Sequence, residues 1–453
     1  MEYFITRINA FVWGIPALIL ILGVGLYLSI KTRFVQVRLF PEALKTFLLS
    51  FRSKGTSYKA LCTALAATIG TGNLVGVAGA IAIGGPGSIF WMWVCALLGM
   101  ATKFAESTLA VCYQKKNEKG ERVGGPMYMI RDGLEKNWHW LSGVYCFMGV
   151  AAAFGVGNAT QVNAITGGIR SAFLTMGFSY PQWGNLAVGV GVSVLILLIL
   201  LGGAGKIGDM AQKLVPAAAA IYLLLGTGIL ILRSRYIPAA LHAIVSGAFR
   251  PQAVTGGVIS SIFTAVRVGA ARGVFTNEAG MGTAAIAHGS ASVRHPVQQG
   301  LMGIMEVFLD TIVICTLTAL VILCSGISIP FSVDMGAAIT SSAFTAVCGT
   351  WASVCIALIL CCFAFATILG WGLYGARCAQ FLFGDGVWSL FVWIQAITVI
   401  IGSLLKTGVV WMISETVNGL MAIPNLIALA LLCPKLVELM GDYEKGLGKS
   451  KKS

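Results

Sequence analysis

Charged residues are scarce in this sequence: 11% of its 453 residues are Asp, Glu, Lys or Arg, whereas 57% are hydrophobic. A soluble domain carries about 25% charged residues, so this composition excludes an ordinary soluble protein. The nucleotide-binding pattern GxxxxGK followed by Ser or Thr does not occur, which excludes a P-loop ATPase. The metalloprotease pattern HExxH and the hydrolase pattern GxSxG are also missing, so we expect no enzyme.

Cysteine and histidine are present without the spacing that binds metals or forms disulfides. The 12 cysteines are scattered through apolar segments with no CxxC pair, and the 4 histidines form no cluster. We interpret the cysteines as buried, inert thiols, and we expect no organic cofactor. The first apolar run has no basic flank before it and no small-residue cleavage site after it, so it is expected to be a retained span.

Long apolar runs dominate the chain. A helix needs about 20 apolar residues to cross a bilayer, and this criterion predicts an all-α polytopic membrane protein with eleven spans. The predicted spans lie near residues 10–30, 60–82, 87–112, 142–172, 185–201, 214–232, 256–280, 299–325, 351–376, 387–405 and 411–432.

The basic residues gather in alternate connections. Lys and Arg are abundant in 31–59, 113–141 and the tail 433–453, whereas 173–184 and 326–350 contain neither. The positive-inside rule therefore predicts a multi-pass protein of the plasma (inner) membrane, with the amino terminus outside and the tail in the cytoplasm. The net charge of +14 is thereby attributed to topology and to contact with anionic membrane lipids, so no nucleic acid is expected as a partner.

The ten spans after the first form two sets of five. The long connections 113–141 and 326–350 occupy equivalent places in the two sets, and an odd number of spans per set predicts an inverted repeat. We expect an amino-terminal helix and basic loop at 1–59, a first repeat at 60–232, an extracellular connection at 233–255, a second repeat at 256–432 and a basic tail at 433–453.

The first span of each set carries glycines and polar residues at its middle. The earlier reads ALAATIGTGNLVGVAGAIA, and the later reads SSIFTAVRVGAARGVFTNEAGMGTA, residues 260–284. A discontinuous helix leaves N–H groups that suit a carboxylate and carbonyl groups that suit a small cation. These second and seventh spans are therefore expected to be interrupted around a binding site at the membrane midplane.

Several long motifs resemble signatures of the alanine/glycine:cation symporter family. They are AATIGTGNLVGVA, GGPGSIFWMWVCALLGMATKFAE, GGPMYMIRDGL, RGVFTNEAGMGTA, FLDTIVICT, ATILGWGLYG and NGLMAIPNLIAL. The resemblance covers nearly the whole chain. It implies a LeuT-type inverted-repeat fold and uptake of small amino acids coupled to Na⁺, in some members to H⁺.

The resemblance also suggests residues that contact the substrate. The substrate carboxylate is expected at Thr71 and Gly72 with Asn73 close by, Gln161 resembles a substrate-contacting glutamine, and Trp371 is expected to wall the pocket. In the seventh span the break is expected within 264–269, which would add Thr264, Val268 and Gly269 to the substrate site. The alternative is a break at 275–280.

The co-transported cation has its own expected ligands. LeuT-like geometry suggests the carbonyl groups of Ala66 and Ile69 with the hydroxyl of Thr367, although Ala366 stands where many relatives have a serine. Asp310 and Glu306, one turn earlier, form the remaining pair of carboxylates at depth, and either is expected to join a second cation site or to relay a proton.

Four further charges are expected to act as gates or structural supports. Arg272 and Glu278 are expected at a cytoplasmic gate or a helix end, and Lys103 and Glu106 are expected to pair with each other while snorkelling. The chain is thus expected to import alanine, glycine or serine with Na⁺ by alternating access. An H⁺-coupled symporter and a passive amino-acid channel remain open, and nothing in the sequence sets the oligomeric state, a monomer included.

Overall fold

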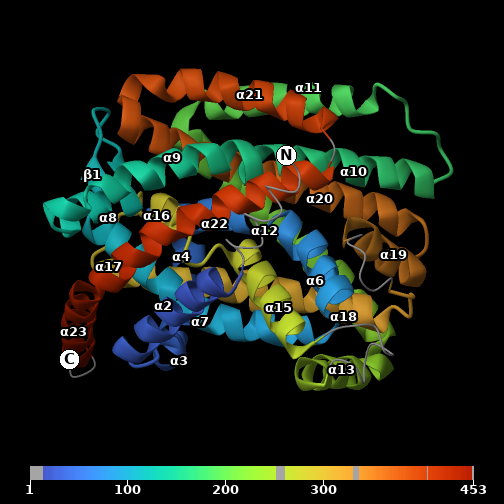
Figure 1. Ribbon diagram of the computed structural model, residues 1–453, viewed down its shortest axis with the longest axis horizontal. Helices are drawn as coiled ribbons and strands as arrows, with labels where there is room; N and C mark the ends of the chain where they lie inside the picture. Colours follow the sequence, from blue (N-terminus) through green and yellow to red (C-terminus); the bar gives the residue numbers. More distant parts are fainter. Residues whose placement is uncertain (1–13, 251–260, 330–335, 406, 451–453) are drawn as a thin grey trace.

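The computed structural model describes residues 14–250, 261–329, 336–405 and 407–450, and almost all of them are helical. The strands in these ranges are β1 (Lys115–Lys116) and β2 (Arg122–Val123), which pair antiparallel in one small hairpin. The long helices run alongside one another, as Figure 1 shows, so the chain forms a single helical bundle. The first residues of the predicted spans 10–30 and 256–280 lie outside the described ranges.

Most helices match predicted spans. Seven described segments are long and apolar enough to cross a membrane, or eight if one bent pair counts as a span. They are α7 (Gly87–Cys112), Lys136–Thr175, α12 (Gly203–Leu232), Pro296–Cys324, α20 (Trp351–Phe383), Asp385–Leu404 and Ile413–Leu431. The helices α2 (Ile15–Lys31) and α11 (Gly184–Leu200) are apolar but shorter. A polytopic α-helical membrane protein is confirmed, while the count of eleven and the inverted repeat stay predictions.

Three of the long segments change helix type along their length. Lys136–Thr175 contains η2 (Lys136–Trp138), α9 (Trp140–Phe154), η3 (Gly155–Ala159) and α10 (Thr160–Thr175). Pro296–Cys324 contains α17 (Pro296–Val307), η5 (Phe308–Cys315) and α18 (Thr316–Cys324), and Asp385–Leu404 contains η6 (Asp385–Val387) and α21 (Trp388–Leu404). The elements η1, η3 and η5 are π-helical turns. Such turns are rare overall but often occur at functional sites, so they indicate a site in the middle of the bundle.

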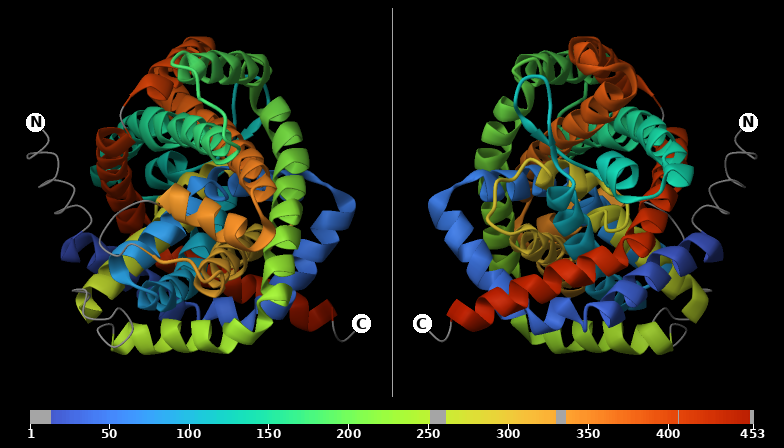
Figure 2. Two further views of the ribbon diagram at one scale, coloured as in Figure 1. Left: turned by 90° about the vertical axis from the view of Figure 1, so that its right-hand side faces the viewer. Right: turned by 90° about the vertical axis from the view of Figure 1, so that its left-hand side faces the viewer.

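The two ends of the bundle carry different short elements. The basic end holds α3 (Val35–Arg38), α4 (Phe40–Ser53), the hairpin, α8 (Pro126–Gly133) and α23 (Cys433–Ser450), on the left of Figure 1. The opposite end holds η4 (Ser234–Tyr236), α13 (Ile237–Phe249) and α19 (Gly336–Cys348), on the right. Seen along the bundle in Figure 2, α4, α13 and α23 lie crosswise to the long helices.

Small residues let the central helices approach closely. A Cβ on Gly303 of α17 would collide with the Lys103 carbonyl of α7, and a Cβ on Gly157 of η3 would collide with Trp371 of α20. Glycine at these contacts is typical of helix packing in membranes, where close backbone approach replaces the hydrophobic effect. This packing brings α7, α17, α20 and η3 around the interrupted helices.

The second predicted span is broken where the sequence indicates. Helix α5 (Thr56–Thr68) ends before Gly70, and η1 (Gly72–Gly76) continues as α6 (Val77–Gly84) at an angle of 49° to it. Ile69 adopts an extended conformation and the Gly70 N–H donates to Asn73 Oδ1 at 2.9 Å, so a side chain closes the break. The predicted discontinuity is confirmed.

The seventh predicted span is broken at a different place from the one expected. Helix α15 (Ile262–Asn277) is continuous through 264–269, and the chain resumes as α16 (Thr283–His288). The interruption is formed by left-handed backbone at Glu278, Gly280 and Gly282, which ends a helix. A break at 264–269 was wrong because Gly269 there serves close packing: a Cβ would collide with the Ser88 carbonyl. The alternative at 275–280 overlaps the observed break.

Candidate functional site

A small cavity lies between the two interruptions. It is lined by Ala67, Thr68, Gly70, Thr71, Gly72, Val156, Gln161, Phe275, Glu278, Thr367 and Trp371. These residues come from α5 and η1, from η3 and α10, from α15 and its end, and from α20. The cavity measures about 10 Å³, which is room for about one water molecule. An amino acid would therefore fit only after side chains move.

Two polar atoms of the cavity have no hydrogen-bond partner within the described structure. They are Thr71 Oγ1 and Gln161 Oε1, both on buried residues. Gln161 Nε2 donates to the Val156 carbonyl at 3.0 Å, which turns Oε1 away from that backbone. Because buried polar groups are normally paired, these two atoms indicate a ligand that would complete them. The N–H groups at the start of η1 lie beside Thr71 and add partial positive charge.

The other side of the cavity carries a carboxylate. Glu278 is buried; its Oε1 accepts from Trp371 Nε1 at 2.8 Å and its Oε2 accepts from Thr283 Oγ1 at 2.7 Å. The Trp371 side chain thereby links α20 to the break after α15. Glu278 was expected at a cytoplasmic gate or a helix end, and it does lie at the end of α15. Its place in the cavity lining was not predicted, because the break was placed about three turns too early.

The structure brings together most of the residues expected at the substrate. Thr71, Gly72, Gln161 and Trp371 all line the cavity. Asn73 does not: its Oδ1 accepts from Gly70 N, and its Nδ2 donates to Asp310 Oδ1 at 2.6 Å. Asn73 therefore braces the first break and joins it to η5.

Thr264, Val268 and Gly269 are absent from the cavity lining, so the structure does not place them with the other expected substrate residues. Thr264 N donates to Ser261 Oγ at 3.1 Å and so belongs to the amino-terminal cap of α15. Val268 would contact a Cβ on Gly84 at 3.2 Å, and Gly269 packs on α7. These residues lie one to three turns before Phe275, and they were chosen because the break was expected at 264–269.

The expected cation ligands lie where the end of α5 meets α20. Thr367 lines the cavity, donates to the Phe363 carbonyl at 3.1 Å, and sits so close to Gly70 that a Cβ there would be 2.5 Å from its Oγ1. The last carbonyl groups of a helix have no intrahelical partner, and those of Ala66 and Ile69 belong to this end. Carbonyl and hydroxyl oxygens are the ligands that hard cations prefer.

Asp310 lies in a second polar cluster, which connects the two breaks. Its Oδ2 accepts from Thr311 Oγ1 at 2.8 Å, and Thr311 Oγ1 in turn accepts from Asn277 Nδ2 at 3.1 Å. With Asn73, this cluster joins η1, η5 and the end of α15. Sequence reasoning missed Asn277 and Thr311, although the polar run TNE in a membrane span was a usable signal.

The buried charges pair differently from the prediction. Lys103 Nζ lies 2.8 Å from Glu306 Oε1, and both side chains are fully buried, so Lys103 neither snorkels nor pairs with Glu106. Glu306 Oε2 also contacts His288 Nε2 at 3.0 Å. Glu106 Oε1 instead accepts from the N–H groups of Gly280 and Gly282, each at 3.0 Å. A built-in carboxylate thus occupies donors of the second break, whereas at the first break the Gly70 N–H is taken by Asn73 and the Thr71 hydroxyl has no partner.

Arg272 pairs with a carboxylate of another helix, and its expected role at a cytoplasmic gate or a helix end stays a prediction. Its Nη1 is 2.9 Å from Glu415 Oε1 on α22 (Thr407–Leu431). Arg272 precedes Phe275 by about one turn of α15. Figure 1 shows that the start of α15 faces the end of the bundle that carries α13. The pair therefore lies between the cavity and that opposite end.

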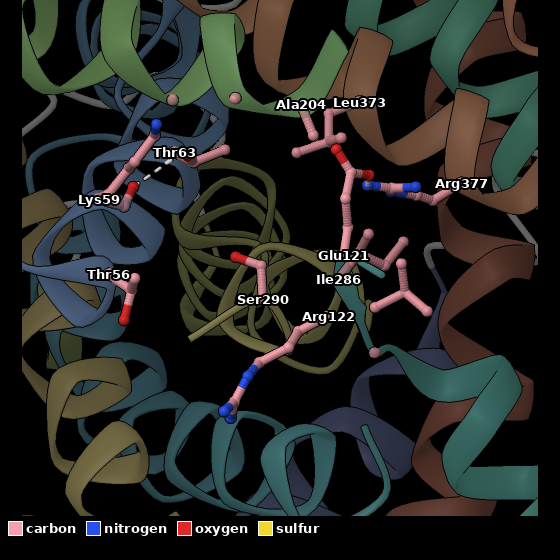
Figure 3. Close-up of a pocket in the computed structure, with 14 residues that line it drawn as sticks. Thr56, Lys59, Thr63, Glu121, Arg122, Ala204, Ile286, Ser290, Leu373 and Arg377 are labelled. Carbon is pink, nitrogen blue, oxygen red and sulfur yellow. Dashed lines mark hydrogen bonds and ion pairs between the residues drawn. The ribbon is translucent and has the colours of Figure 1, made fainter. Parts of the chain in front are cut away.

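A larger cavity of about 190 Å³ opens at the basic end, and we name it the vestibule. Figure 3 shows Lys59 and Thr63 of α5 on one side, with Glu121 and Arg377 facing each other on another. Arg377 Nη2 lies 2.7 Å from Glu121 Oε2. Partial burial acts to raise the pKa of Glu121, but the hydrogen bond and charge of Arg377 outweigh it and hold that pKa below its usual value. Thr63 lies one turn before Ala67, so the vestibule approaches the small cavity.

Comparisons with known proteins agree with this geometry. The sequence profile described as "Sodium:alanine symporter family" matches residues 1–453. The chain is 39% identical to the "Sodium/alanine symporter AgcS" of Methanococcus maripaludis, covering 94% of each chain. It is 34% identical to the "Probable sodium/glutamine symporter GlnT" of Bacillus subtilis, covering 98% of this chain and 91% of the relative.

A solved structure supports the fold. The crystal structure of MhsT in complex with L-phenylalanine superposes with a TM-score of 0.57 at 14% identity, covering 84% of this chain and 97% of that one. MhsT has the LeuT-type fold that the motifs implied. The relatives are transporters, which confirms that a transporter rather than an enzyme was the right expectation. This chain belongs to the sodium:alanine symporter family.

Proposed function

We propose that this protein imports small neutral amino acids, alanine and glycine foremost and serine as a further substrate, by symport with Na⁺. The observation that supports this most is the cavity between two interrupted helices, in which Thr71 Oγ1 and Gln161 Oε1 are buried without partners. The description of AgcS as a sodium/alanine symporter supports the choice of ion and substrate class.

The substrate carboxylate is proposed to bind at the first break. The N–H groups at the start of η1 and the Thr71 hydroxyl offer donors to an anion. Trp371 and Phe275 wall the cavity with large rings, which leaves little room beside the α-carbon and favours a hydrogen or methyl side chain. Asn73 is proposed to act indirectly, because its hydrogen bonds to Gly70 N and Asp310 hold the break in its conformation.

Two cation sites are proposed next to the substrate. The first combines the carbonyl groups of Ala66 and Ile69 with the Thr367 hydroxyl. The second uses the Asp310 carboxylate with Asn73 and Thr311, which already form a buried hydrogen-bonded cluster. A monovalent cation moving down about 100 mV releases about 2.3 kcal/mol, which supports roughly 40-fold accumulation of a zwitterion.

Alternating access is proposed to work by opening the two ends of the cavity in turn. The vestibule at the basic end stops about one helical turn from the cavity, and the Arg272–Glu415 pair lies on the opposite side. Helix α19 covers that side as well, where Thr340 Oγ1 donates to the Leu74 carbonyl of η1 at 2.8 Å. With the basic end in the cytoplasm, this arrangement is closed to the outside, and the proposed repeats 60–232 and 256–432 move relative to each other.

Uptake by purified protein in liposomes tests the proposal. We expect labelled alanine to accumulate under an inward Na⁺ gradient and unlabelled glycine and serine to compete with it. Equal accumulation driven by a proton gradient without Na⁺ would show that H⁺, and not Na⁺, is the coupled ion. Equal uptake with no gradient would show a passive channel and would overturn symport.

The proposed outer gate has its own test. Arg272→Ala removes the ion pair with Glu415, and a single cysteine placed at Thr71 reports access to the cavity. We expect membrane-impermeant thiol reagents added from outside to label that cysteine faster in the Arg272→Ala background. An unchanged labelling rate would contradict a gating role for the pair.

A further inference from the structure

Among the residues that the structure describes, Glu278 is the one carboxylate in the lining of the small cavity, and neither the substrate nor the cation assignments above use it. We propose that Glu278 is the counter-ion of the substrate's ammonium group and that it sets the requirement for an α-amino group. This inference rests on the proposed function, because it assigns a recognition role within the same cavity.

The cavity has two electrostatic poles. Thr71 and Gly72 lie at a helix start, where free N–H groups carry partial positive charge. Glu278 lines the same cavity from the second break, directly after the carboxyl end of α15, where free carbonyl groups carry partial negative charge. An amino acid is a zwitterion with its charges on adjacent atoms, so its carboxylate fits the first pole and its ammonium group fits the second.

Within the described part of the chain, the Glu278 carboxylate has no cation of its own. Both oxygens accept from neutral donors, Trp371 Nε1 and Thr283 Oγ1. In the described ranges no Lys, Arg or His nitrogen forms a salt bridge with it. Lys103 is the cation that acts on Glu278 most strongly, yet its ammonium group is bound to Glu306 at 2.8 Å. A buried charge is normally paired, so Glu278 has capacity for a cationic ligand.

The backbone at Glu278 is also held in an uncommon conformation. Its φ of 54° is left-handed, a conformation that is strained for a residue with a Cβ. Glycine would remove that strain, and glycines do occupy the left-handed positions 280 and 282 of the same break. Strain of this kind persists where the surroundings impose it and gathers at ligand sites. The hydrogen bond to Trp371, which itself lines the cavity, fixes the carboxylate at the cavity wall.

Equilibrium binding by the purified full-length protein tests the inference, with saturating Na⁺. Labelled alanine is displaced by unlabelled alanine or by lactate, which replaces the ammonium group with a hydroxyl at the same size. We expect Glu278→Gln to lower the affinity for alanine at least about 30-fold, as for loss of one partner of a buried charge pair. Affinity for lactate should change far less, so the preference for alanine over lactate should shrink by a similar factor.

Two variants separate charge from structure. Glu278→Asp keeps the carboxylate and should keep the preference for alanine, which leaves the inference testable if Glu278→Gln does not fold. Thr283→Val removes one neutral hydrogen bond to Glu278, and we expect it to lower alanine affinity by about fivefold or less. Na⁺-dependent thermal stabilisation without substrate should survive in Glu278→Gln.

Two results would overturn the inference. An alanine-to-lactate preference unchanged in Glu278→Gln would reduce Glu278 to a structural role, and loss of the substrate-free Na⁺ stabilisation would assign its carboxylate to the metal ion. If wild-type protein showed no Na⁺-dependent alanine binding, the proposed function would fail first, and the two failures are thereby distinguishable.

Discussion

The Lys103–Glu306 pair offers a sharp test of the buried charge network. Both side chains are fully buried and their charged atoms are 2.8 Å apart, and His288 Nε2 lies 3.0 Å from the other carboxylate oxygen of Glu306. Replacing Glu306 by Gln leaves the Lys103 ammonium group buried without its counter-charge. Breaking a buried pair from one side costs about 3–5 kcal/mol, because the remaining charge is uncompensated.

The double variant Lys103→Met with Glu306→Gln removes both charges while keeping similar volumes. We expect it to recover most of the stability that Glu306→Gln loses, since a neutral replacement of a buried pair is often close to neutral in free energy. The assay is the temperature at which half of the detergent-solubilised protein still elutes as a monodisperse peak after heating. If Glu306→Gln melted like wild type, or if the double variant melted below Glu306→Gln, the reasoning would be refuted.

Three further predictions concern the site and the vestibule. Asn73→Ala and Gln161→Ala should each abolish Na⁺-driven alanine uptake in liposomes while the protein remains folded, and unchanged kinetics in both would show that the pocket is misplaced. Thr367→Val should raise the Na⁺ concentration for half-maximal uptake at least about tenfold while Thr367→Ser changes it little, and equal values would remove the hydroxyl from the cation site. The pKa of Glu121 is lowered, so its contact with Arg377 stabilises the fold at pH values above the ordinary carboxyl range, and this stabilisation is lost as the pH falls through the pKa of the folded state. Glu121→Gln should therefore reduce the acid sensitivity of thermal stability. An unchanged pH profile would contradict this contribution.

The lengths of the apolar runs predicted many of the helices because membrane spans have simple requirements. The predicted span 87–112 coincides with α7, and the first break at Gly70 follows from glycines and polar groups where lipid offers no hydrogen bonds. Short helices such as α13 and α19 were not singled out, since their lengths are below the spanning criterion and they lie in connections.

The second break shows where the sequence was insufficient. Gly269 and Gly280 cannot be distinguished by residue type. Gly269 allows close packing against Ser88, whereas Gly280 adopts a left-handed backbone conformation. Only the three-dimensional neighbours distinguish these uses of glycine. The same limit applies to charge pairing: Lys103 and Glu106 are three residues apart on one helix, yet Lys103 pairs with Glu306 across to α17. Partners from distant helices are set by packing, which local spacing does not contain.

The central claim is that the two interrupted helices bind a small amino acid and its cation between them. An experimental density map of the protein with alanine and Na⁺ tests this most directly. The account predicts alanine density bounded by Gly72, Gln161, Glu278 and Trp371, with the carboxylate toward Gly72 and an ion within reach of Thr367 or Asp310. Alanine density elsewhere, or unbroken helices on both sides of this cavity, would contradict it.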